Sequence, residues 1–168
     1  MLRENFIGST SNPLIKKECI YEVGRFDTEM QSSQDYDLWL RIAKRYSVNY
    51  IEKSLLNYHI HNNSRISTNL DKRIEGRERI IEKYQDDINN DKKIWYLRHR
   101  NLVILYAIKR WKKKALLLWG KCIAKYPWNV NRDLKLLFLI IFGLDSLPYS
   151  LYKKTEDTLN GLLQKRSP

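Results

Sequence analysis

The sequence predicts an α/β fold in which helices dominate. Hydrophobic residues make up 43% of the 168 residues and aromatic residues 12%, which is enough to bury a core. In the second half, apolar residues recur at helical spacing, whereas the first ninety residues suggest short helices and one strand. We therefore expect two parts: an α/β part at residues 1–90 and an all-α extension at residues 91–168.

Net charge divides the chain near the same position. The chain has 31 Lys and Arg against 19 Asp and Glu, a net charge of +12. Eleven of the basic residues lie between Lys92 and Lys125, where no acidic residue occurs, and the rest of the chain is close to neutral. Asp and Asn residues at positions 86–91 are typical of a turn and mark the boundary.

Two short helices are predicted in the first part. The first ends at Gly24, because a residue without a Cβ adopts a left-handed cap at low cost. The second begins near Ser32, and Leu38 and Ile42 share its apolar face. Ser32 and Asp35 have the spacing of a capping box, which places the Asp35 carboxylate at the positive end of the helix dipole.

A strand is predicted from Val48 to about His61, because apolar and polar side chains alternate there. Tyr58 and Ile60 point to one face of this strand, and His59 and His61 point to the other. Helical spacing predicts the remaining elements, which are helices at about 71–84, 92–110, 113–126, 134–142 and 147–164.

Two patterns are typical of metal ligands. Residues 35–37 match the D-x-D pattern of sugar-nucleotide enzymes, but here the pattern opens an amphipathic helix, and Asp37 is spaced to pair with Arg41. We therefore reject a metal role for it. His59 and His61 share one strand face and could reach one metal, although two histidines without further ligands also suit a polar surface.

The basic stretch is rich in aromatic residues and has three interpretations. Its cations form a solvated helix surface, attract an anionic membrane surface that Trp and Tyr also favour, or bind nucleic acid. We do not expect nucleic acid as the partner, because no recognised binding module accompanies the charge. The longest apolar run, Leu136 to Leu144, is shorter than the about 20 residues of a membrane-spanning helix.

Five segments of the first part follow one another in a telling order. They are residues 5–10 (NFIGST), 14–17 (LIKK), 22–27 (EVGRFD), 34–41 (QDYDLWLR) and 58–67 (YHIHNNSRIS). This order resembles that of family 2 glycosyltransferases, inverting enzymes of the GT-A fold that use nucleotide sugars. The resemblance covers residues 4–84 and only the acceptor side of the family's domain. It implies that residues 1–90 are the C-terminal half of a GT-A-type domain.

The resemblance also implies roles for individual residues. Asp35 would be the general base that takes a proton from the acceptor hydroxyl, with Gln34 beside it where the family usually has Glu. Gly24 would shape the acceptor-side loop and contribute to substrate binding. His61 would be a ligand or neighbour of a divalent metal (Mg or Mn), and His59 would contact the diphosphate.

The implied function is sugar transfer, with inversion, from a nucleotide-sugar donor to a glycan or lipid-linked acceptor in cell-surface polysaccharide synthesis. We expect the chain to be a truncated form that is inactive alone, or that needs a partner chain carrying the nucleotide-binding half. Its cationic helices would hold it in the cytoplasm at the inner face of the cell membrane. The alternative is a non-enzymatic basic helical module that binds a membrane surface or an anionic polymer.

Overall fold

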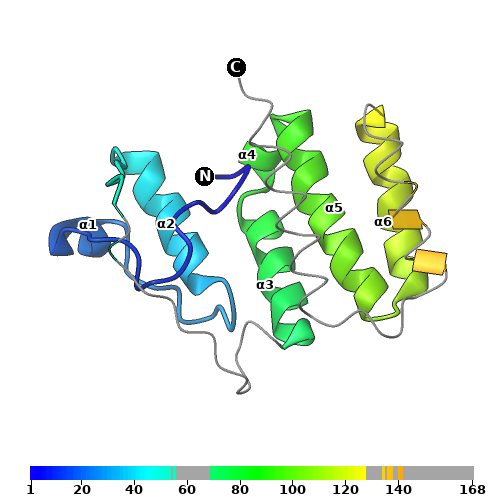
Figure 1. Ribbon diagram of the computed structural model, residues 1–168, viewed down its shortest axis with the longest axis horizontal. Coiled ribbons are helices and arrows are strands. Elements are labelled where there is room, and N and C mark those ends of the chain that lie inside the picture. Colours follow the sequence, from blue (N-terminus) through cyan, green and yellow to red (C-terminus); the bar gives the residue numbers. More distant parts are fainter. Residues whose placement is uncertain (54, 56–68, 128–133, 135, 138–139, 142–168) are drawn as a thin grey trace.

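The computed structural model describes residues 1–53, 55, 69–127, 134, 136–137 and 140–141 (Figure 1). Within these residues the chain forms six continuous helices and no strand, and residues 134, 136–137 and 140–141, within the predicted helix at 134–142, are helical as well. The helices are α1 (Lys17–Glu22), α2 (Gln34–Arg45), α3 (Leu70–Lys83), α4 (Gln85–Asn89), α5 (Lys92–Ile108) and α6 (Lys112–Lys125).

The predicted α/β fold, and with it the GT-A-type domain half, is wrong for the part of the chain that the structure describes. Residues 48–53 and 55, the expected start of the strand, have no regular secondary structure. Tyr50 is 82% exposed and Ile51 70% exposed, so neither side chain packs on a core. An isolated strand leaves its backbone groups without partners, and a sheet needs further strands to be stable. Residues 56–61 lie outside the described residues.

The helices follow the apolar spacing closely. The helices predicted at about 92–110 and 113–126 are α5 and α6, and the break between them is a short turn at residues 109–111. In place of the predicted turn at 86–91, the chain forms the short helix α4. Asp91 is the N-cap of α5, because its side chain accepts hydrogen bonds from the Lys93 and Ile94 N–H groups at 2.8 and 3.1 Å.

Helices α5 and α6 form an antiparallel hairpin that contains the largest core (Figure 1). Arg110 adopts a left-handed conformation with φ of 62°, and the N–H groups of Arg110 and Trp111 bond to the carbonyls of Ala107 and Tyr106. This pair of bonds is a Schellman motif, which reverses the chain. The buried residues of α5 and α6 then face each other, and Ile74 of α3 joins them.

A second core joins α2 to α3, α4 and α5. Tyr36 and Leu40 of α2 pack with Ile80 of α3 and Ile88 of α4, and Trp95 of α5 contacts the same cluster. Packing therefore crosses residue 90, where the sequence predicts a division into two parts. None of the helices that the structure describes has the length and apolar character of a membrane span.

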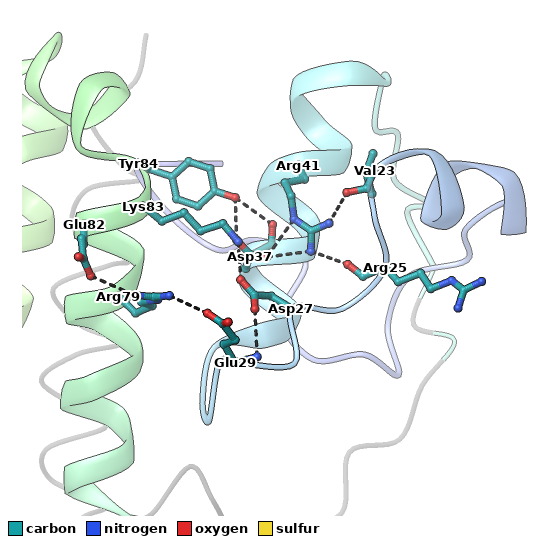
Figure 2. A network of polar contacts seen from close by, with 10 residues as sticks. All are labelled: Val23, Arg25, Asp27, Glu29, Asp37, Arg41, Arg79, Glu82, Lys83 and Tyr84. Atoms are coloured by element: carbon teal, nitrogen blue, oxygen red, sulfur yellow. Dashed lines mark hydrogen bonds and ion pairs between the residues drawn. The ribbon is translucent and has the colours of Figure 1, made fainter.

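A buried carboxylate fixes α2 against α3 (Figure 2). Asp37 is fully buried, and its Oδ2 lies 2.9 Å from Arg41 Nε, as the sequence predicts. Its Oδ1 lies 2.9 Å from Lys83 Nζ and accepts a hydrogen bond from the Tyr84 hydroxyl at 2.8 Å. Removing water from a carboxylate is costly, and these partners replace the water.

The same network orders the loop before α2. Arg41 donates to the carbonyl of Val23 and, at 2.6 Å, to that of Arg25, while Lys83 also pairs with Asp27 at 2.7 Å. Burial acts to lower the pKa of Lys83, but its bonds to Asp27 and Asp37 outweigh burial and raise that pKa. Lys83 is therefore charged at neutral pH, and its ion pairs with Asp27 and Asp37 hold α3, the loop before α2 and α2 together.

We expect Asp37→Asn to lower the free energy of unfolding by about 3–5 kcal/mol, because it leaves Arg41 and Lys83 without their shared counter-charge. Urea denaturation measures the change. Asp87→Asn is the matched control: Asp87 pairs with Lys44 on the surface, and the loss should stay below about 1 kcal/mol. Equal effects of the two substitutions would contradict a central role for Asp37.

Candidate functional site

A pocket of about 440 Å³ opens at the start of α2. It collects residues from the N-terminal segment, the beginning of α2, one face of α3 and the middle of α5. The lining residues are Asn5, Thr10, Ser32, Ser33, Gln34, Asp35, Tyr36, Arg73, Arg77, Ile80, Ile81 and Arg98. The volume is within the range of small-ligand sites in proteins.

The first turn of α2 forms one wall of the pocket without a side-chain cap. Ser33 is the N-cap residue, with a left-handed φ of 62°, and its side chain makes no capping bond. The predicted capping box of Ser32 and Asp35 is therefore wrong, because Ser32 precedes the cap and is buried. Asp35 Oδ1 instead accepts the N–H of Tyr36 at 2.7 Å.

The start of α2 lies unusually close to α3. A Cβ built on Gly76 would lie 2.8 Å from Ser33 Oγ and 2.9 Å from both Ser32 O and Ser32 Oγ. Only glycine fits this approach without a shift of the Ser32 backbone. Arg73 and Arg77 lie one turn apart on α3 and line the same pocket as Asp35.

Arg98 of α5 also lines the pocket. Its Nε donates to the carbonyl of Leu2 at 2.6 Å, its Nη2 donates to the Tyr36 hydroxyl, and its guanidinium lies 4.9 Å from the centre of the Tyr36 ring. Burial lowers the pKa of Arg98, and the nearby charge of Arg77 lowers it further, although Tyr36 and Glu4 oppose the shift. Arg77 and Arg98 are therefore close enough for each charge to affect the other.

Among the described residues, the pocket is lined by three guanidinium groups and by the carboxylate of Asp35. Asp35 is half-buried, and no described cation forms an ion pair with it. This lining does not fit a divalent cation. The described residues contain no group of three His, Cys, Asp or Glu side chains that could hold one.

Two of the predicted site residues meet in this pocket. Gln34 and Asp35 line it together. Gly24 does not line it: it ends α1 with φ of 91°, as expected for a left-handed cap, and its nearest side-chain neighbour is Arg41. His59 and His61 lie outside the described residues, so the diphosphate contact and the metal ligand remain predictions.

Sequence reasoning missed the three arginines. Arg73 and Arg77 have i,i+4 spacing and continue along α3 into Ile80 and Ile81, so the stripe could have been read as one face. In the sequence, Arg98 stands out only as one cation of the basic stretch at residues 92–125. No spacing in the sequence relates α5 to the start of α2, because that relation depends on the packing of α2, α3 and α5.

Comparisons with known proteins give no relative. No protein-family model matches the chain, and no curated protein or solved structure is similar enough to it to suggest a relationship. The resemblance to family 2 glycosyltransferases therefore remains a prediction from the five segments of the sequence.

We expect Gly76→Ala to lower the free energy of unfolding by about 1 kcal/mol. The clash with Ser32 costs about 1–3 kcal/mol, and the higher helix propensity of alanine returns about 1 kcal/mol. Gly120→Ala on α6 is the matched control, because its Cβ would meet nothing within 4 Å; it should stabilise by about 1 kcal/mol. Equal stabilisation of both variants in urea denaturation would refute the close approach of α2 to α3.

Proposed function

We propose that the chain supplies the acceptor side of a glycosyltransferase, with Asp35 as the general base. The observation that carries this proposal is the position of Asp35: its carboxylate lines a pocket and has no cationic partner among the described residues. A carboxylate that is held rigidly but keeps an open lone pair suits proton abstraction. We propose the reaction alone, without a GT-A sheet in the described residues.

In the proposed reaction, Asp35 accepts the proton of an acceptor hydroxyl. The hydroxyl oxygen forms a bond to the anomeric carbon of the donor sugar, while the bond from that carbon to the nucleotide diphosphate breaks. Attack from the side opposite the leaving group inverts the configuration. The nucleotide sugar and its divalent metal would be bound by residues outside the described part or by a partner chain, and the described residues supply the base and the acceptor pocket.

A second candidate function concerns helix α6. Lys113, Leu117 and Lys121 follow one exposed face of this helix, and Leu117 is 71% exposed. Trp111 at its start is 37% exposed and lies under Lys114, whose Nζ is 4.5 Å from the ring centre. Apolar and cationic side chains on one face suit an anionic lipid surface better than a nucleic acid. We therefore also propose peripheral attachment to the inner face of the cell membrane.

The base is tested by Asp35→Asn. With the chain combined with a nucleotide-binding half, sugar transfer measured by mass spectrometry should fall about 10²–10⁴-fold, because the amide cannot accept the proton. Asp87→Asn removes a surface carboxylate that pairs with Lys44 and is not among the described lining residues, so it should leave transfer unchanged. Undiminished transfer by Asp35→Asn would remove Asp35 from the role of base.

The membrane proposal is tested by sedimentation with vesicles. The chain should bind phosphatidylserine vesicles but not phosphatidylcholine vesicles, and salt should weaken binding because it screens the attraction. Leu117→Glu should reduce binding, whereas Leu14→Glu, at a residue exposed in the N-terminal part, should not. Binding that is equal on both vesicle types, or a salt-dependent shift with DNA alone, would count against a membrane function.

A further inference from the structure

A cluster of rings and one cation joins α5 to α6 at the end of the hairpin opposite its turn. The ring of His99 stacks on that of Trp95, one turn earlier on α5, with 3.8 Å between the ring centres and 16° between the planes. The Lys125 ammonium of α6 lies 4.5 Å from the centre of the same Trp95 ring. Beside them, the ring centres of Tyr96 and Tyr126 lie 5.1 Å apart. We call Trp95, His99 and Lys125 the hairpin latch, because they hold the last turn of α6 against the start of α5.

The surroundings of His99 favour the neutral imidazole. Its Nδ1 lies 2.8 Å from the carbonyl oxygen of Trp95, which can only accept, so Nδ1 carries the proton of the neutral ring. Burial lowers the pKa of His99, and the charges of Lys125 and Lys121 lower it further, whereas the bond to the Trp95 carbonyl opposes the shift. The half-buried ring therefore takes a second proton less readily in the folded chain than in the unfolded chain.

The described charges that act on His99 are both positive. Lys121 and Lys125 present them from α6, and the stretch from Lys92 to Lys125 contains no acidic residue. Helices α3 and α4 also pack against α5, and acidic groups of these two helices bond to other partners. Such pairs are Asp71 with Lys109, Glu78 with Tyr106, and Asp87 with Lys44. A proton added to His99 thus meets two lysines and no described carboxylate that bonds to it.

We propose that the hairpin latch makes the packing of α6 on α5 sensitive to acid: protonation of His99 adds a third positive charge beside Lys121 and Lys125 and loosens α6. Like charges repel more strongly where side chains are partly buried. The unfolded chain takes up the proton near the ordinary histidine pKa of about 6.5, and the folded chain takes it up only at lower pH. The contribution of His99 to stability is therefore complete above pH 6.5 and is lost as the pH falls below that value.

The latch would also regulate the membrane attachment of α6, and this extension rests on the proposed function. Leu118 and Trp119 of α6 pack against the core of the hairpin. When α6 loosens, these apolar side chains become available to the boundary between lipid headgroups and acyl chains. The negative potential of an anionic membrane concentrates protons at its surface, so His99 is protonated more readily there. Acid and an anionic surface would then act in the same direction.

Urea denaturation of the chain at pH 7.5 and at pH 5.5 tests the latch. The native chain should lose stability at the lower pH, and His99→Phe, which keeps a ring on Trp95 but cannot be protonated, should lose less. His99→Gln, which keeps a polar side chain without the ring, should show the same reduced loss. All other titratable groups are shared by the three proteins, so the difference reports on His99. An equal loss in all three would overturn the proposal.

A pair of lysine variants tests the cause of the sensitivity. Lys121→Gln removes one of the charges that act on His99 and should reduce the loss of stability in acid. Lys113→Gln is the matched control, since it removes an exposed charge about two turns earlier on α6 and should leave the loss unchanged. Amide exchange should place the effect at residues 121–125, whose protection factors should fall in acid more than those of α3. Equal results for the two lysine variants would overturn the proposed repulsion.

Sedimentation with phosphatidylserine vesicles separates the latch from the membrane function. The native chain should bind more at pH 5.5 than at pH 7.5, and His99→Phe should gain less. No vesicle binding at either pH, together with a loss of stability in acid that depends on His99, would refute the attachment and leave the latch standing. Vesicle binding without such a loss of stability would refute the latch and leave the attachment standing.

Discussion

The carboxylate of Asp37 is shielded from water on all sides, and the arrangement of α2 depends on the groups that meet it. Arg41 reaches it from the same helix, and Lys83 and Tyr84 reach it from the end of α3. A buried charge of this kind tolerates few alternative geometries, because each lost partner leaves an uncompensated charge. Arg41 also bonds to the carbonyls of Val23 and Arg25, so the loop before α2 is ordered by the same charge.

Asp35 and Asp37 are two residues apart and have opposite environments. Residues at i and i+2 point to different sides of a helix, so Asp37 faces α3 while Asp35 faces the pocket. Asp37 is surrounded by cations that bond directly to it and leave no lone pair open to a ligand. Asp35 lines the pocket together with Arg73, Arg77 and Arg98, and it forms no ion pair with a described cation. One short motif therefore contains a structural carboxylate and one that is available to a ligand, and the fold separates the two roles.

Local patterns in the sequence predict much of this fold and little of its site. Apolar spacing locates α2, α3, α5 and α6, and the i,i+4 spacing predicts the pair of Asp37 and Arg41, because these features depend on neighbours within a few residues. The predicted strand is absent at residues 48–53 and 55, because alternation of side chains does not provide a partner strand. The predicted capping box of Ser32 and Asp35 is wrong because Ser33, with a left-handed backbone, is the N-cap residue in place of Ser32. The arginine pocket depends on the close approach of Ser32 and Ser33, just before α2, to Gly76 of α3, a contact that no local spacing records.

The hairpin of α5 and α6 has a consequence for the order in which the molecule folds. Its two helices are joined by three residues and pack along their length, so their contacts close only short loops and are expected to form early. Helix α2 reaches α3 from a distant part of the chain, and its docking closes a much longer loop. We expect α2 to be the first helix to detach in native-state fluctuations, and its detachment separates Asp35 from the arginines.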